Sequence, residues 1–88
     1  MFISHVRLLF NIATRMMLQW LNIELNPKHA EAHFNRGLLH KDARKHHRAI
    51  SDYNKALEIK PGYGRAVANR GYAYVLPLIP LLFVLLLG

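Results

Sequence analysis

The chain has 88 residues, 52% of them apolar, which is enough for one domain with a modest core. It contains no cysteine, and this excludes disulfides and thiolate metal sites. Twelve lysines and arginines against five acids give a net charge of +7, a balance that attracts acidic partners, nucleic acid or an anionic membrane surface.

The first segment, residues 1–26, predicts one amphipathic helix from about residue 4 to residue 25. Its apolar residues recur at the spacing of a single helical face, and they are Val6, Leu9, Phe10, Ala13, Met16, Met17 and Trp20. The long apolar run that a signal peptide needs is interrupted at Asn11, Arg15 and Gln19. We therefore expect this helix to pack on the helix that follows it.

A turn at Asn26 and Pro27 begins the second segment, residues 27–63, which predicts two antiparallel helices. The first helix, helix A, places small, apolar or ring-bearing residues on one face, at Ala30, His33, Phe34, Gly37 and Leu38. The second helix, helix B, repeats that spacing at His46, Ala49, Ile50, Tyr53, Ala56 and Leu57. Pro61 ends helix B, because the residue before a proline is pushed out of the α region.

Gly37 favours this hairpin over one long helix through the same residues. A glycine in mid-helix costs about 1 kcal/mol relative to alanine, so close packing against a second helix is the better reason for it. Ala49 is the matching small residue on helix B. We expect Gly37 and Ala49 to meet where the two helices cross.

The sequence also repeats itself with a period of 34 residues. Six of nineteen aligned pairs are identical, where average composition gives about one. The identities pair Glu24 with Glu58, Pro27 with Pro61, Ala32 with Ala66, and Asn35-Arg36-Gly37 with Asn69-Arg70-Gly71. Residues 64–75 therefore predict a second helix A.

Residues 30–63 resemble the tetratricopeptide repeat (TPR), and the positions that fit its spacing are His33, Arg36-Gly37, His40, Ala49, Tyr53, Ala56 and Pro61. The departures are histidines in place of large aromatic residues, Arg36 in place of leucine, and Arg44 in place of the turn glycine. The resemblance implies an all-α fold, a TPR-like antiparallel helical hairpin. It is flanked by the N-terminal helix, as a degenerate helix of a preceding repeat, and by a truncated second repeat with an apolar tail.

By the same resemblance, the module is a scaffold that binds a protein or an extended peptide, without catalytic activity or cofactor. The A helices of the family line a concave groove, which here would present Phe34, Asn35, Leu38, Lys41, Arg65, Asn69 and Tyr72. The two asparagines can each donate to and accept from a peptide backbone. The positive net charge favours an acidic peptide.

Catalytic and metal sites are not predicted, and neither is a small-molecule substrate. Ser4 and Ser51 lack a nucleophile elbow, and the glycines of residues 62–64 lack the context of a P-loop lysine. The histidines do not form a converging set of three or four ligands with metal-site spacing. Asp42 and Asp52 are expected on an exposed face.

The connector between helices A and B, residues 41–48, carries four lysines or arginines and one acid. We expect a solvated turn. The alternative is a basic, nucleic-acid-binding helical protein, in which Lys41, Arg44, Lys45 and Arg48 contact phosphates. That alternative is not favoured, because no aromatic residue interleaves the charges for base stacking.

Residues 76–88 form an apolar tail, and no charged residue occurs from position 71 onward. Pro77 and Pro80 are expected to interrupt a helix there. Eighteen residues of helix reach about 27 Å, just short of a bilayer core of about 30 Å. Three interpretations stay open: a membrane anchor on a cytoplasmic repeat, a segment packed on the repeat, and an artefactual end of a longer repeat array. Exposed in water, the tail also predicts self-association.

Overall fold

The structure of the chain, a computed structural model, describes residues 2–88, with side chains from Ile3 onward. Within this range the chain is helical apart from short turns, and it has no strand. The elements are α1 (Phe2–Leu25), α2 (Ala30–Asp42), α3 (His46–Ile59), α4 (Gly64–Val75), the 3-10 helix η1 (Leu76–Leu78) and α5 (Ile79–Leu87). The predicted all-α class is confirmed.

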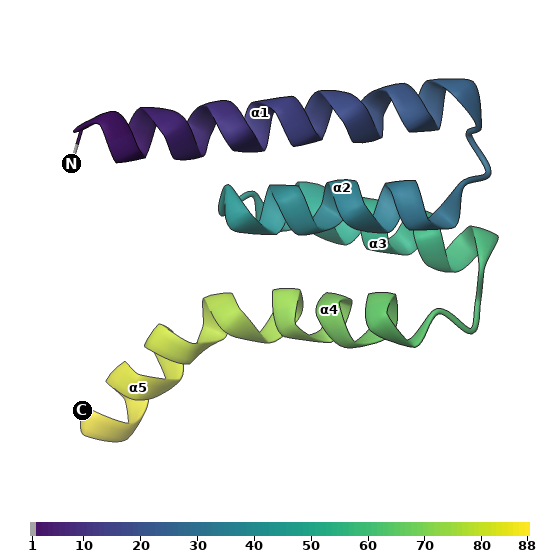
Figure 1. Ribbon diagram of the computed structural model, residues 1–88. Coiled ribbons are helices and arrows are strands. Elements are labelled where there is room, and N and C mark those ends of the chain that lie inside the picture. Colours follow the sequence, from purple (N-terminus) through teal and green to yellow (C-terminus); the bar gives the residue numbers. More distant parts are fainter. Residues whose placement is uncertain (1) are drawn as a thin grey trace.

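Helices α2 and α3 form an antiparallel hairpin, α1 packs on α2, and α4 packs on α3 (Figure 1). A turn at residues 43–45 separates α2 from α3, so the alternative of one long helix is excluded. The chain thus runs as four antiparallel passes, followed by α5, which bends away from the line of α4 (Figure 1).

The core lies where α2, α3 and α4 meet. Phe34 and Tyr53 are its largest fully buried side chains, with ring centroids 5.7 Å apart, and the ring of Tyr63 covers Phe34 at 5.0 Å. The remaining buried positions of this cluster are alanines, namely Ala49, Ala56, Ala66 and Ala73. Small residues let the helix backbones approach one another, so a core with few large side chains still packs closely.

Gly37 is a point of close approach, but its partner differs from the expectation. A Cβ atom placed on Gly37 would lie 2.6 Å from Cε1 of Tyr53 and 3.2 Å from Cβ of Asp52. The expected packing of Gly37 on Ala49 is therefore wrong: the glycine leaves room for the large Tyr53 ring. The equivalent glycine of the second helix A, Gly71, faces open space.

The α2–α3 turn depends on an unusual backbone conformation at Arg44, whose φ is 61°. Side chains other than glycine rarely adopt this left-handed region, because Cβ approaches the carbonyl oxygen. The sequence pattern identified this position, since the family places a glycine there. The turn is closed by backbone hydrogen bonds from Arg44 to the carbonyl of Lys41 and from Lys45 to that of His40.

Replacing Arg44 with glycine is expected to raise the free energy of unfolding by about 0.5 to 1 kcal/mol, because glycine adopts positive φ without strain. Urea unfolding of the full chain in a mild detergent measures the change. The control is Ala43→Gly, at the neighbouring position with φ −84°, which should be neutral or destabilising. A loss of stability in Arg44→Gly would show that the turn does not impose the strain.

The apolar stripe predicted on α1 does not face α2 as expected. Of its members, only Met16 is partly buried, whereas Leu9, Phe10 and Met17 are more than 60% exposed. One reason is length, since α1 has 24 residues and α2 has 13, so the first half of α1 extends beyond its neighbour (Figure 1). Another is that α2 presents polar Arg36 and His40 to the stripe.

Helix α4 continues into η1 and α5 despite two prolines. Pro77 and Pro80 each lie at the first or second position of a helical element, where a missing N–H is tolerated, so the α-helix is interrupted by a 3-10 turn and then resumes. The stretch Gly64–Leu87 is long and apolar enough to cross a membrane by length and composition, and only 6% of its most apolar window is buried. Tyr74–Leu87, here called the arm, lies beyond the last buried residue of α4, Ala73.

Candidate functional site

The structure places the predicted groove residues on α2 and α4. On α2, Asn35, Leu38 and Lys41 are partly buried, and the side chain of Leu38 packs against the core. On α4, Arg65 and Tyr72 are exposed and Asn69 is partly buried. Both helices pack on α3, so they flank it. Six of the seven side chains therefore retain some accessible surface.

Phe34 is the exception, and its assignment to a binding surface is corrected here. The side chain has no exposed area, because Tyr53 and Tyr63 cover its ring and the guanidinium of Arg65 lies 5.0 Å from the ring centroid. A cation over an aromatic face is attracted by the ring quadrupole. Phe34 thus belongs to the core, and it fixes the start of α4 relative to α2.

Asn69 uses part of its hydrogen-bonding capacity within its own helix. Its Nδ2 donates to the backbone carbonyl of Arg65 at 2.8 Å. The side-chain oxygen can accept a hydrogen bond from a peptide N–H without disturbing this contact. The expected equivalence of Asn35 and Asn69 is therefore incomplete, since among the hydrogen bonds described for this chain only Asn69 has such a contact.

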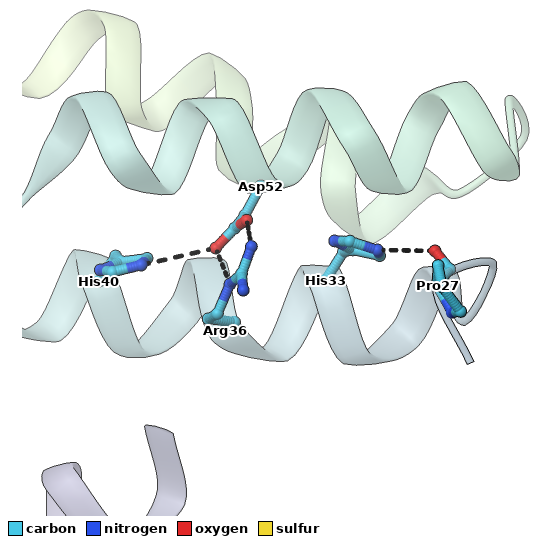
Figure 2. Close-up of polar contacts among 5 residues, drawn as sticks. All are labelled: Pro27, His33, Arg36, His40 and Asp52. Carbon is cyan, nitrogen blue, oxygen red and sulfur yellow. Dashed lines mark hydrogen bonds and ion pairs between the residues drawn. The ribbon is translucent and has the colours of Figure 1, made fainter. Parts of the chain in front are cut away.

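A buried ion pair joins α2 to α3 (Figure 2). Nε of Arg36 donates to Asp52 at 2.9 Å and Nη2 donates to the second carboxylate oxygen at 2.7 Å, a bidentate arrangement. Asp52 is 5% exposed, so the expectation that it lies on an exposed face is wrong. The contact raises the pKa of Arg36 above its already high value, chiefly through the hydrogen bond to Asp52.

His40 lies beside the same carboxylate, with Nε2 3.6 Å from Asp52 (Figure 2). Proximity to Asp52 favours the protonated imidazole, whereas burial and the positive charges of Arg36, Arg48 and Lys45 oppose it. Burial is the largest of these influences, and the pKa of His40 is lowered from its ordinary value of 6.5. Arg36 already holds both carboxylate oxygens, which leaves His40 without a dedicated partner for a charge.

The lowered pKa of His40 makes stability depend on pH. Below about pH 6.5 the unfolded chain binds a proton at His40 while the folded chain does not, so the free energy of unfolding should fall as pH falls through this range. Above it both states are neutral and the effect vanishes. Urea unfolding at a series of pH values should show a shallower dependence for His40→Gln. A wild-type chain stabilised by His40 at low pH would instead indicate a dominant ion pair with Asp52.

His33 fixes the entry into α2 (Figure 2). Its ring is 5% exposed, and Nε2 lies 2.9 Å from the carbonyl oxygen of Pro27. Because a carbonyl only accepts hydrogen bonds, Nε2 carries the proton and donates. The ring therefore holds the Asn26-Pro27 turn against α2.

A basic pocket of about 570 Å³ lies between the α2–α3 turn and the end of α4. One wall is the basic turn, defined as residues 44–48, together with Ile50, and the other is Ala73, Tyr74 and Pro77. Four of the five residues that follow Ala43 in this turn are exposed, and none is acidic. The pocket therefore combines an apolar floor with a cationic rim.

Sequence reasoning identified the charges of the basic turn but missed its partners. The apolar wall comes from Tyr74 and Pro77, which lie 26 residues or more beyond Arg48 along the chain, and no local pattern links the two segments. The Arg36–Asp52 pair was missed for the same reason. Within residues 2–88, no group of three or more His, Cys, Asp or Glu side chains is arranged to hold a metal ion.

Comparison with known proteins agrees with the hairpin geometry. Residues 30–63 match the sequence model of the family described as Tetratricopeptide repeat, a span that begins at the first residue of α2 and ends just before α4. No curated protein and no solved structure matches the chain. The α2–α3 hairpin and the turn that follows it are thus a tetratricopeptide repeat.

Proposed function

We propose that this protein is a scaffold whose tetratricopeptide repeat binds a protein or an extended, acidic peptide. The observation that carries the proposal is the family match over residues 30–63, because repeats of this type form helical protein-interaction scaffolds. The surface we propose consists of the accessible predicted residues of α2 and α4, which are Asn35, Leu38, Lys41, Arg65, Asn69 and Tyr72.

The chemistry of this surface suits a peptide backbone with acidic side chains. Lys41 and Arg65 supply positive charge, Asn35 supplies an amide for the backbone, and Tyr72, 63% exposed, supplies a large amphipathic contact. Tyrosine and arginine are enriched at the energetic centres of protein interfaces. Phe34 supports the surface from below by fixing Arg65 in place.

A peptide library with acidic and neutral members tests the proposal on the full chain in mild detergent. For the peptides selected, Asn35→Ala should weaken binding by about 2- to 10-fold, the effect of losing one hydrogen bond, with helicity unchanged. The matched control is Asn11→Ala, on the exposed surface of α1. Equal affinities for the wild type and an Asn35→Ala, Asn69→Ala double variant would place the binding surface elsewhere.

A second candidate function is membrane anchoring, which the apolar stretch Gly64–Leu87 favours. The anchor would hold the scaffold at a membrane without contributing to peptide recognition. Packing restricts how it can insert, because Ala66 and Ala73 are buried against the hairpin. While α4 stays packed on α3, only the arm is available to a bilayer.

A further inference from the structure

The arm is long enough to enter a bilayer while the hairpin stays folded. Its 14 residues, from Tyr74 to Leu87, extend about 21 Å at 1.5 Å per residue. That is more than one leaflet of a hydrocarbon core about 30 Å thick, but less than the whole core. Its large apolar side chains are all between 43% and 84% exposed, so the fold offers them no other shelter.

The base of the arm meets the basic pocket. Tyr74 and Pro77 form one wall of that pocket, and Arg44, Lys45 and Arg48 stand on the opposite wall. If the arm enters the apolar core of a bilayer, these three cations lie at its entrance, the depth of the lipid headgroups. Tyr74 is 56% exposed at the same level, where tyrosine is enriched in membrane proteins.

Charge is unevenly distributed between the two ends of the molecule. Three of the five acids lie at the end away from the basic turn, since Glu24 is near the end of α1, Glu31 near the start of α2 and Glu58 near the end of α3. Asp52 is held by Arg36, so only Asp42 lies near the basic turn. An anionic surface therefore meets mostly attraction at this end.

Two apolar segments extend past the hairpin at that end. Both chain ends lie on the side of the α2–α3 turn, with α1 on one side of it and α5 on the other (Figure 1). The exposed large apolar residues of the extended part of α1 are Ile3, Val6, Leu8, Leu9 and Phe10. The same end of the molecule thus presents apolar surface and positive charge together.

We infer that the basic turn and the base of the arm form a site for the anionic headgroups of a membrane into which the arm inserts. The inference rests on the proposed anchoring and adds the class of lipid. The headgroup phosphate lies in the pocket between Arg48 and Tyr74, and its acyl chains run along the arm. Juxtamembrane lysines and arginines bind anionic leaflets through this attraction, which salt weakens.

The test compares vesicles of phosphatidylcholine alone with vesicles that also contain phosphatidylglycerol, using the full chain diluted from detergent and a flotation assay. We expect partition into the anionic vesicles to be at least about tenfold stronger, and to weaken as salt is raised. In a variant with Arg44→Gln, Lys45→Gln and Arg48→Gln, this preference should be largely lost. The control, with Lys28→Gln, Lys55→Gln and Lys60→Gln, removes the same charge from the opposite end and should keep it.

The outcomes separate the headgroup site from the anchor. Equal partition into both kinds of vesicle would leave the anchor intact and overturn the headgroup site. Failure to float with either kind would overturn the anchor and the headgroup site together, while peptide binding by the repeat would be unaffected. If the triple variant of the basic turn loses binding to a single-stranded oligonucleotide but keeps its preference for anionic vesicles, the turn serves nucleic acid and the inference is wrong.

Discussion

Replacing Arg36 with leucine is expected to lower the free energy of unfolding by about 3 kcal/mol, the cost of leaving one partner of a buried ion pair alone. The carboxylate of Asp52 has a side-chain exposure of 6% and would lose both hydrogen bonds from the guanidinium. The introduced leucine recovers some apolar contact but cannot hydrogen-bond the carboxylate. Urea unfolding of the full chain in mild detergent, followed by circular dichroism, gives the change.

The opposite truncation should cost less. In Asp52→Ala the remaining charge belongs to Arg36, whose side chain is 25% exposed and can turn toward water, so we expect a loss of about 1 to 2 kcal/mol. The double variant should be more stable than Arg36→Leu alone, since no buried charge is left unpaired. Additive losses in the double variant would contradict a direct coupling between the two residues.

Replacing Gly37 with alanine should destabilise the hairpin by about 1 to 3 kcal/mol through overpacking. The added methyl group would stand 2.6 Å and 2.8 Å from two carbons of the Tyr53 ring, closer than carbon atoms approach. Because Tyr53 is fully buried and packs on Phe34, its ring cannot move without disturbing the core. Thermal or urea unfolding of the variant measures the loss.

Gly71 provides a matched control at the equivalent position, 34 residues later. A Cβ there meets nothing within 4 Å, so Gly71→Ala adds helix propensity without a clash. We expect it to be neutral or to stabilise α4 by up to about 1 kcal/mol. If both substitutions changed stability in the same direction, close packing at Gly37 would not be the reason for its glycine.

The sequence allowed the hairpin to be predicted because its signals are local or periodic. Pro61 ends a helix by its own sterics, and the 34-residue period relates Gly37 to Gly71 without any knowledge of the fold. The strained turn was also foreseeable, since Arg44 stands at a position where the family has glycine, and its φ is positive.

Contacts between helices could not be predicted in the same way, because they depend on how each helix is rotated about its axis. Gly37 contacts Tyr53 rather than Ala49, one turn away on the same face of α3. Asp52 lies next to Tyr53 in the chain and was assigned to the surface, but the rotation of α3 turns it toward Arg36. The burial of Phe34 likewise depends on Arg65, contributed by another helix.

The central claim is that residues 30–63 fold as a hairpin in which α2 packs closely on α3. Proton nuclear Overhauser measurements on the isotope-labelled full chain test it directly. We expect cross-peaks from the α-protons of Gly37 to the ring of Tyr53, and from the ring of Phe34 to the rings of Tyr53 and Tyr63. Helical signals throughout residues 30–59 without these cross-peaks would contradict the hairpin and, with it, the tetratricopeptide scaffold.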